Sequence, residues 1–350
     1  MPEQPHPLNV SCPLPLSDHA TVQLAHGGGG RLMRRLIEEM FLPAFRGPTP
    51  AHDSAVLQLG PTRLAFTTDT FVVHPLFFPG GDIGKLAVCG TVNDLAMAGA
   101  RPLWLSAAFV LEEGLPMETL RRVVASMRDE ARRAGVQIVT GDTKVVDRGH
   151  GDGLFVNTAG IGLVPERIEI SPRRVAPGDA ILISGDLGRH GLAVMSVREA
   201  LGFESQLASD CESLAGLVEA LLALGADLHC LRDLTRGGLA AALNEIAVDA
   251  AVGMEVQEAA IPVSEAVAGA CELLGLDPLY AANEGRLVAF VSAAAASRAL
   301  EILRSHPAAH GPALVGTVLA EHAGLVELRS VLGGGRILDL LSGEQMPRIC

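Results

Sequence analysis

The stretch GTVNDLAMAGARPLWLS, residues 90–106, decides the fold class of this 350-residue chain. Its first half continues a helical pattern that begins at Asp82, a candidate N-cap, and ends at Ala98 because Gly99 follows. Its second half opens the run PLWLSAAFVL, residues 102–111, whose apolar and aromatic side chains predict a strand. A helix followed at once by a strand indicates mixed α and β structure.

The same alternation continues on both sides of this stretch. Upstream, HGGGG (residues 26–30) precedes an amphipathic helix over 31–42, and residues 63–73 form a strand pattern. Downstream, a helix over Pro116–Ala134 is stopped by Gly135. Residues 136–146 predict a strand that ends in a Gly-Asp turn, and residues 153–164 predict another strand.

A second α/β half begins after a Pro-rich stretch at residues 170–188, which marks a linker. Helical patterns cover 191–201, 212–224, 237–250 and 263–274, and strand patterns cover 254–256, 287–292 and 313–319. We therefore expect a flexible leader at 1–21, an N-terminal domain at 22–170, a C-terminal α/β domain at 171–335 and a mobile tail at 336–350.

Composition excludes several classes of function. With 49% hydrophobic and 19% charged residues the chain is globular, and with 3% aromatic residues its cores depend on aliphatic side chains. A net charge of -13 disfavours nucleic acid and anionic membranes as partners, because both require a cationic surface. The first residues show no signal-peptide pattern and no apolar run has the length of a membrane span, so we expect a cytoplasmic protein.

The cysteines are scattered and contain no CxxC pair, so they indicate neither a zinc site nor a disulfide framework. Four of them lie in apolar or helical contexts typical of small core residues: Cys89, Cys211, Cys230 and Cys271. Cys350 is the last residue of the chain, in the sequence MPRIC. Met346 precedes a proline, which favours extended geometry, so we expect the terminus to leave the body as a strand-like arm.

Five aspartates recur in loops or at element ends, each flanked by small residues: Asp53, Asp69, Asp94, Asp142 and Asp233. Carboxylates in apolar surroundings are costly unless something neutralises them. Mg²⁺ bound together with ATP phosphates would do so, and the series is long enough for more than one ion. The alternative for any single aspartate is a helix cap or a turn residue.

Two glycine stretches, HGGGG and LTRGGLA (residues 234–240), could let backbone N–H groups approach phosphates, the second directly at a helix start. Neither matches the P-loop or the GxGxxG pattern, and a glycine cluster by itself is more often a turn.

The order of the motifs resembles the hydrogenase maturation proteins of the E type. The motifs are HGGGG, HDSAVL, TTDTFVV, GTVNDLAMAGARPLWLS, GDTKVV, NTAGIG, DLTRGGLA, NEGRLV and a terminal PRIC, and the resemblance covers residues 22–350. These proteins are carbamoyl dehydratases within the ATP-binding superfamily of aminoimidazole-ribonucleotide synthetase, selenophosphate synthetase and thiamine-monophosphate kinase. HGGGG stands where the family pattern has HGSGG, so a hydroxyl that could contact phosphate is missing.

The resemblance implies a two-domain aminoimidazole-ribonucleotide-synthetase-like fold and a homodimer whose N-terminal sheets form a β-barrel across the interface. ATP would lie in the cleft beside it. By position in the motifs, the five aspartates would hold Mg²⁺ and phosphates, and Gly141 and Gly237 would line the nucleotide.

The resemblance also implies that a partner carbamoyltransferase loads a carbamoyl group onto Cys350. ATP then drives dehydration of this S-carboxamide to an S-cyanate, and an iron-carrying scaffold complex accepts the cyanide for the [NiFe]-hydrogenase. The catalytic base would be Glu284 or Lys144, with His150 a third candidate. From Arg336 the tail spans at most ~50 Å, enough to dock in its own ATP cleft and to swing out again.

Two other functions remain open from the sequence. One is another ATP-using enzyme of the superfamily, a selenophosphate synthetase or a small-molecule kinase. The selenium enzyme requires a reactive cysteine near the glycine-rich loop, whereas Cys12 lies well before HGGGG. The other is a metallochaperone that uses Cys350 as a thiol ligand.

Overall fold

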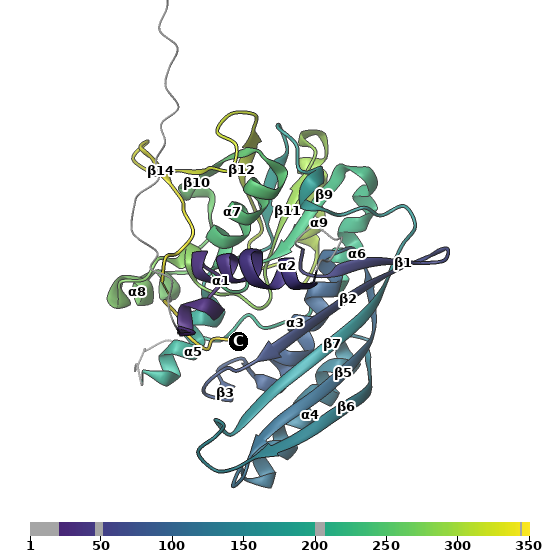
Figure 1. The fold of residues 1–350 in the computed structure, drawn as a ribbon. Helices are drawn as coiled ribbons and strands as arrows, with labels where there is room; N and C mark the ends of the chain where they lie inside the picture. The colour runs from purple at the N-terminus through teal and green to yellow at the C-terminus, as the bar shows by residue number, and fades with distance from the viewer. Residues whose placement is uncertain (1–20, 46–51, 200–206, 344) are drawn as a thin grey trace, which may run out of the picture.

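The computed structural model describes residues 21–45, 52–199, 207–343 and 345–350, which form two α+β halves, each with its own sheet (Figure 1). The first sheet contains, in spatial order, β1 (Ala55–Leu59), β2 (Thr62–Phe71), β7 (Leu154–Val164), β5 (Arg101–Glu112) and β6 (Gln137–Val146). The second contains, in spatial order, β14 (Gly335–Ile337), β13 (Val326–Arg329), β10 (Gly253–Gln257), β12 (Ala313–Leu319), β8 (Ala180–Ile183), β11 (Leu287–Val291) and β9 (Leu228–Asp233). The two-domain architecture is the one predicted.

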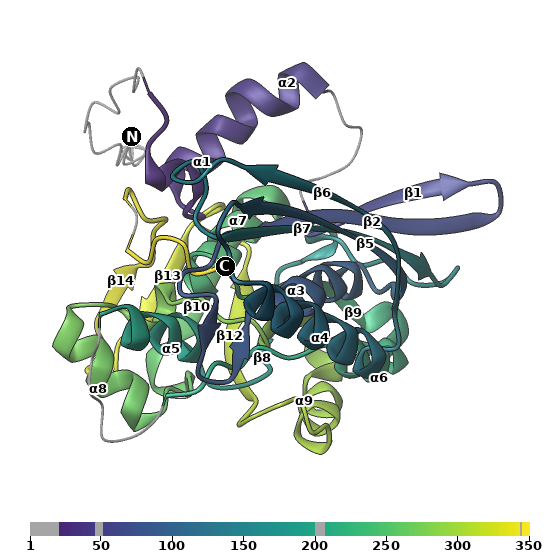
Figure 2. The same ribbon diagram turned by 90° about the horizontal axis from the view of Figure 1, so that it is seen from below.

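Two helices, α3 (Ile83–Met97) and α4 (Met117–Arg133), cover one face of the first sheet (Figure 2). Burial alternates strictly along β7, because successive side chains of a strand point to opposite faces. The other face exposes large apolar side chains, among them Phe66, Trp104 and Val139. Within the part of the chain that the structure describes, this face is therefore exposed.

The deciding stretch folds as expected. Asp82 caps α3, accepting hydrogen bonds from the N–H groups of Gly84 and Lys85. The helix ends just before Gly99, whose φ of 70° lies in the left-handed region that glycine adopts without strain. Close packing of α3 on the sheet requires Gly160, where an added Cβ would lie 2.8 Å from side-chain atoms of Leu95 and Thr91.

The second sheet is covered on both faces, so its central strands are apolar throughout. In β8, Ile181 and Ile183 pack toward α7 (Gly238–Ala250). The alternate residues Ala180 and Leu182 pack toward α6 (Ala215–Leu221) and α9 (Ala296–Ser305). Continuous hydrophobic runs are typical of strands buried on both faces. Two further helices, α5 (Arg189–Arg198) and α8 (Glu265–Leu274), complete this half.

The N-terminal segment is helical, as predicted. It comprises α1 (Arg31–Leu36), a π-helical turn at Ile37–Phe41 and α2 (Leu42–Phe45). A short hairpin of β3 (Phe77–Phe78) and β4 (Gly81–Asp82) precedes α3. None of the described helices is long and apolar enough to cross a membrane.

One strand prediction was wrong in detail. Residues 136–146 were expected to end in a Gly-Asp turn, but Gly141 and Asp142 lie inside β6, where they pair with Ala107 and Ala108 of β5. β5 approaches β6 closely at this point: an added Cβ at Gly141 would lie 2.1 Å from the Ala107 carbonyl oxygen. The glycine therefore allows close strand packing and does not form a turn.

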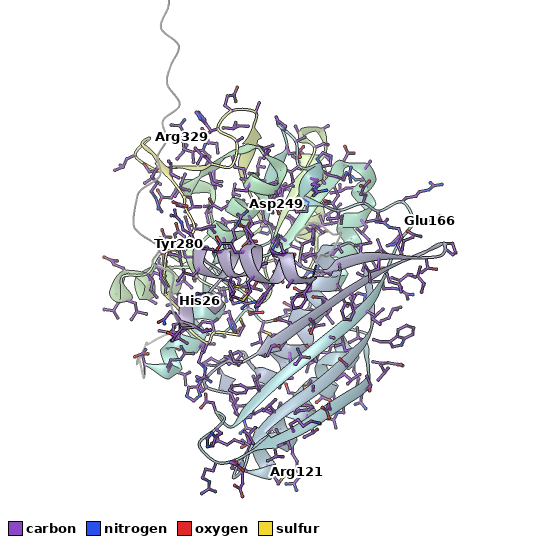
Figure 3. All side chains as sticks on the ribbon, viewed as in Figure 1. His26, Arg121, Glu166, Asp249, Tyr280 and Arg329 are labelled. Atoms are coloured by element: carbon purple, nitrogen blue, oxygen red, sulfur yellow. The ribbon has the colours of Figure 1, made fainter. Side chains whose placement is uncertain are left out.

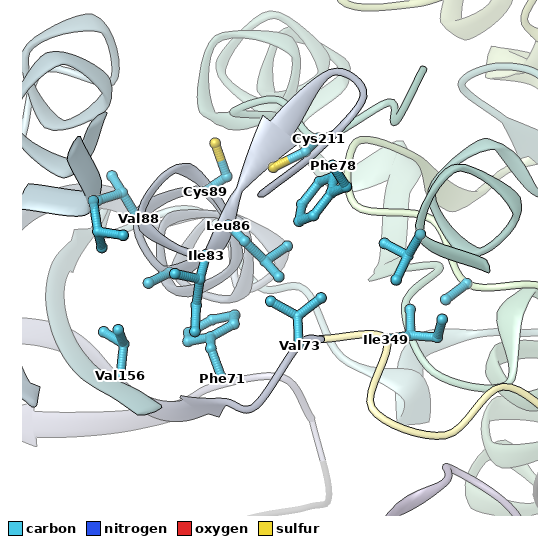
Figure 4. Packing of buried hydrophobic residues seen from close by; sticks show 14 of the residues in the cluster. Phe71, Val73, Phe78, Ile83, Leu86, Val88, Cys89, Val156, Cys211 and Ile349 are labelled. Atoms are coloured by element: carbon cyan, nitrogen blue, oxygen red, sulfur yellow. The ribbon is translucent and has the colours of Figure 1, made fainter. Parts of the chain in front are cut away.

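The terminus also differs from the expected strand-like arm that leaves the body. Ile349 is 2% exposed and belongs to a cluster that includes Phe71, Val73 and Leu86 (Figure 4). Met346–Arg348 form a bend and turn, and Arg348 has a φ of 55°. The last residues are therefore docked between the two halves. Four cysteines, Cys89, Cys211, Cys230 and Cys271, are buried and free as predicted, and Cys12 lies outside the described residues.

We predict that Gly160→Ala destabilises the protein by about 1–3 kcal/mol, because the new methyl group overlaps the packed face of α3. Gly269→Ala in α8 is the matched control: nothing lies within 4 Å of its added Cβ, so the helix should gain about 0.5 kcal/mol. Urea denaturation midpoints measure both changes. Equal midpoints for the two variants would contradict the packing described here.

Candidate functional site

Three of the five predicted aspartates converge where the two halves meet. Asp53 precedes β1, Asp94 lies on α3 and Asp233 ends β9, and one carboxylate oxygen from each lies within 4.8 Å of the others. The fourth, Asp69, lies on β2 and interacts electrostatically with Asp94 and Asp233. Residues up to 180 positions apart thus form one acidic cluster.

The carboxyl groups of the acidic cluster have raised pKa values. Burial raises the pKa of Asp53 to about 6 against the opposing effect of Arg232. Burial, together with neighbouring carboxylates, raises the pKa of Asp94 and Asp233 well above the ordinary value. Burial also raises the pKa of Asp69, and the positive charge of Arg236 partly offsets this rise. Without a cation, full ionisation of the cluster is therefore costly.

Arg232 partly compensates the cluster. Its guanidinium lies 3.1 Å from Asp53 Oδ1 and 3.1 Å from a carboxylate oxygen of Glu245. Next to Asp53, His52 is kept neutral, since burial and Arg232 lower its pKa to about 3. The Thr67 hydroxyl lies 2.8 Å from Asp94 Oδ2 and 2.9 Å from the Asp53 carbonyl oxygen.

The donor set fits a hard divalent cation. Asp53 Oδ2 and Asp233 Oδ2 are buried without a hydrogen-bond partner among the described residues. Buried carboxylate oxygens without partners are rare unless an ion or water satisfies them. Oxygen ligands of this kind suit Mg²⁺.

The two glycine stretches lie against each other beside the acidic cluster. An added Cβ at Gly29 would lie 2.7 Å from the Arg236 carbonyl oxygen, and Arg236 Nη1 donates to the Gly27 carbonyl at 3.0 Å. Gly237 and Gly238 have φ values of 76° and 58° and open α7. A helix N-terminus is suited to an anion, and here the Gly238 N–H already donates to the Thr235 carbonyl at 2.9 Å.

The tail closes the site on one side. The Leu341 carbonyl accepts from the Arg31 N–H at 2.9 Å, and Arg31 pairs with Asp339. Tyr280, labelled in Figure 3, donates from its hydroxyl to the Asp339 carbonyl at 2.8 Å. The tail therefore follows the glycine stretches before it reaches Cys350.

Cys350 lies within electrostatic range of the acidic cluster and of Arg236. Burial raises the pKa of its thiol to about 12, with Arg236 opposing and Glu284, Asp69 and Asp233 reinforcing the shift. The docked thiol is therefore protonated at neutral pH and is a poor nucleophile.

Glu284 is 2% exposed, and its Oε1 has no hydrogen-bond partner among the described residues. Burial, followed by the neighbouring Cys211, Asp233 and Asp69, raises its pKa well above the ordinary value. A carboxyl group with a raised pKa and a free oxygen is suited to proton transfer near neutral pH.

The remaining predicted residues lie elsewhere in the single chain. Lys144 pairs with Asp142 at 2.8 Å on the exposed edge strand β6, which also carries Gly141. His150 is exposed in the loop after that strand. In one subunit the structure therefore does not place these residues in the acidic cluster.

Several residues of the site were not singled out from the sequence. Arg236 stands inside the motif LTRGG, between Asp233 and Gly237, so its position was a usable signal. Arg232 directly precedes Asp233, and an arginine beside an aspartate in a buried strand is a second signal. By contrast, His190 and Arg198 on α5 contact the tail more than 145 residues away, and no local pattern marks them.

We predict that Asp94→Asn stabilises the cation-free protein at pH 8 by about 1 kcal/mol, because it removes one of the crowded charges. When folding raises the pKa of a carboxyl group, the protein becomes less stable as the pH rises between the unfolded-state and folded-state pKa values. For Asp53 these pKa values are 3.8 and about 6. The variant should therefore show a smaller fall in unfolding free energy between pH 5 and pH 8.

Asp129→Asn is the control, because Asp129 is exposed and Arg128 lowers its pKa. Urea unfolding at the two pH values measures the difference. A pH dependence for Asp94→Asn that equals that of the unsubstituted protein would show that the acidic cluster is not charged as described.

Two sequence families match the chain. The N-terminal domain of the AIR synthase related proteins matches residues 51–164, and their C-terminal domain matches residues 176–328. Carbamoyl dehydratase HypE of Azotobacter vinelandii is 52% identical over 95% of this chain and 98% of the relative. HypE of Rhodobacter capsulatus is 54% identical over 94% and 98%, and HypE of Escherichia coli is 50% identical over 94% and 99%.

Solved structures agree. A crystal structure of HypE in complex with ATP has a TM-score of 0.79 at 51% identity, covering 94% of this chain and all of that one. A HypE–HypF complex gives 0.84 at 48% identity, covering 87% and 99%. A thiamine-monophosphate kinase from Aquifex aeolicus, at 16% identity, 85% and 97% coverage and a TM-score of 0.65, shares the fold alone. The chain therefore belongs to the HypE family of AIR synthase related proteins.

Proposed function

We propose that this chain is an ATP-dependent carbamoyl dehydratase of hydrogenase maturation that converts a carboxamide on Cys350 to a thiocyanate. The observation that carries this function is the docked terminus: Cys350 lies in electrostatic contact with Glu284, Arg236 and the acidic cluster. The name and activity of relatives at about 50% identity over nearly the whole chain support it. A kinase function has weaker support, because the kinase relative shares the fold alone.

The reaction requires ATP because amide oxygen is a poor leaving group. Transfer of the γ-phosphoryl group to the carboxamide oxygen gives an imidate phosphate and ADP. Loss of phosphate, with removal of both N–H protons, leaves S–C≡N. The carboxamide oxygen therefore leaves in inorganic phosphate, and sulfur stays bonded to carbon throughout.

The acidic cluster, the start of α7 and Arg236 would hold the nucleotide and the substrate. The HypE–ATP complex among the relatives supports ATP binding here. Asp53, Asp69, Asp94 and Asp233 would hold Mg²⁺, which screens the phosphate charge when bound. The N–H groups at Gly237 and the start of α7 would donate to phosphate oxygens, and the exposed Arg236 would face the charge that develops on the transferred group.

Glu284 is the base that best fits the docked carboxamide. It is buried and interacts electrostatically with the Cys350 thiol, and its Oε1 has no partner among the described residues. A carboxylate released from its protons by a bound cation nearby can accept an N–H proton of the substrate.

We also propose a homodimer in which two N-terminal sheets close a β-barrel. The exposed apolar face of the sheet and the largely exposed β6 support this, because an open edge strand with apolar side chains can pair with another chain. Dimerisation would bring Asp142 and Lys144 toward the site of the other subunit, where Lys144 could contact phosphate.

Two protein partners follow from the chemistry. A carbamoyltransferase must load Cys350, and the solved HypE–HypF complex supports a partner of this kind. The thiocyanate must then pass its cyanide to an acceptor, which we propose is an iron-carrying scaffold complex.

Intact mass spectrometry tests the function. After incubation with the loading enzyme and carbamoyl donor, the chain should gain a carbamoyl adduct, and adding ATP should make the adduct lighter by the mass of one water. Cys350→Ala should gain no adduct but keep ATP binding. An adduct of unchanged mass after ATP addition would contradict dehydration.

We predict that Glu284→Gln slows the dehydration step by about 10²–10⁴-fold while loading and ATP binding persist, because the amide cannot accept the proton. Glu321→Gln, at an exposed position, is the matched control. Quantifying both adducts over time after ATP addition measures the effect. A Glu284→Gln rate equal to the control rate would exclude Glu284 as the base.

A further inference from the structure

Two backbone hydrogen bonds dock the end of the chain. The Val72 N–H donates to an oxygen of the Cys350 terminal carboxylate at 3.0 Å, and the His74 N–H donates to the Arg348 carbonyl at 3.3 Å. The tail thus lies along the segment that follows β2, as a short bridge between the two halves.

The guanidinium of Arg198 donates hydrogen bonds both to the tail and to the segment after β2. Arg198, in the last turn of α5, donates from Nε to the His74 carbonyl at 2.9 Å and from Nη2 to the Arg348 carbonyl at 2.7 Å. Its Nη1 donates to the Pro347 carbonyl. The fork of an arginine side chain can serve several acceptors in fixed geometry.

His190, two turns earlier on α5, forms a hydrogen bond with the Ile349 carbonyl. Its Nε2 lies 2.9 Å from the Ile349 carbonyl oxygen, which can only accept, so Nε2 carries the proton. Its Nδ1 lies 2.8 Å from the Ser209 hydroxyl, which fixes the ring, and Phe78 packs edge-to-face against it. The carbonyl oxygens of Pro347, Arg348 and Ile349 and an oxygen of the Cys350 carboxylate therefore all have donors.

The docked turn depends on these contacts. Arg348 has a φ of 55°, a conformation that L-residues rarely adopt. Its side chain pairs with Asp152 and donates to the Val72 carbonyl at 3.2 Å. Because the turn is locally unfavourable, the tail should leave the site when enough of the donors are lost.

A carrier residue requires both a docked and a released state. Dehydration requires the loaded Cys350 at the ATP site, whereas a loading enzyme must reach the thiol. The docked Cys350 is only partly exposed and Ile349 beside it is buried, so a loading enzyme has limited access to the thiol. Loading is therefore favoured by release and dehydration by docking, so whatever holds the tail sets the balance between them.

We propose that Arg198 is the positioning residue that holds the tail, and with His190 makes α5 the latch between the docked and released states of Cys350. This inference rests on the proposed function, because it assigns the docked state to dehydration. Its structural part, the holding of the tail by Arg198, requires neither ATP nor a loading partner.

The test uses the full chain carrying Cys12→Ser, so that Cys350 is the accessible thiol, since the other four are buried. Iodoacetamide labelling is followed by intact mass without ATP. Arg198→Ala should label about tenfold faster or more, because it removes the charge-assisted hydrogen bonds that hold the Pro347 and Arg348 carbonyls of the tail. Arg198→Lys, which keeps the charge but loses the fork, should fall between Arg198→Ala and the unsubstituted chain.

Arg304→Ala is the matched control, because Arg304 stands in the last turn of α9 and not at the tail. Hydrogen exchange supplies the second measurement: the Val72 and His74 amides should lose protection in Arg198→Ala and keep it in Arg304→Ala. With ATP and the loading enzyme, dehydration of the loaded adduct should slow in Arg198→Ala while loading does not.

Labelling of Arg198→Ala at the unsubstituted rate, with both amides still protected, would overturn the latch. Faster labelling together with an adduct that never loses water in any variant, the unsubstituted chain included, would support the latch and contradict the proposed function. The two failures are therefore distinguishable.

Discussion

The structure depends on the crowding of four carboxylates, Asp53, Asp69, Asp94 and Asp233, at the junction of two apolar halves. Each comes from a different part of the chain. Burial raises all four pKa values, and repulsion from neighbouring carboxylates adds to the shifts of Asp94 and Asp233. Arg232 offsets part of the negative charge, and a bound cation would neutralise the rest. The site is costly to the folded chain when empty, which is a common property of functional sites.

The tail adds a second charged element to this arrangement. Its terminal thiol enters the side of the site where Glu284 and Arg236 lie, and α5 receives the carbonyl groups of its last residues. Substrate carriage and catalysis are therefore divided between distant parts of the sequence. Cys350 holds the carbon atom, and residues of β9, the turn before α7 and the loop before β11 provide the charges that act on it.

Much of the fold could be predicted from local patterns. Asp82 and Gly99 bound α3 through capping and a left-handed glycine, and both effects act within a few residues. Gly141 and Asp142 misled the prediction because a Gly-Asp pair is typical of a turn, whereas here the glycine allows close approach of β5. The acidic residues were found from their flanking sequence, but that Asp53, Asp94 and Asp233 meet follows from tertiary structure. The docked terminus could not be predicted, because its partners on α5 and after β2 are distant in sequence.

The most direct test of the account follows the oxygen atom. The chain would be loaded with carbamoyl labelled with heavy oxygen at the carbonyl position and then supplied with unlabelled ATP in unlabelled water. Phosphorylation of the carboxamide oxygen predicts that the label appears in inorganic phosphate, one atom for each thiocyanate formed. Label that appears in water, with unlabelled phosphate, would contradict the account.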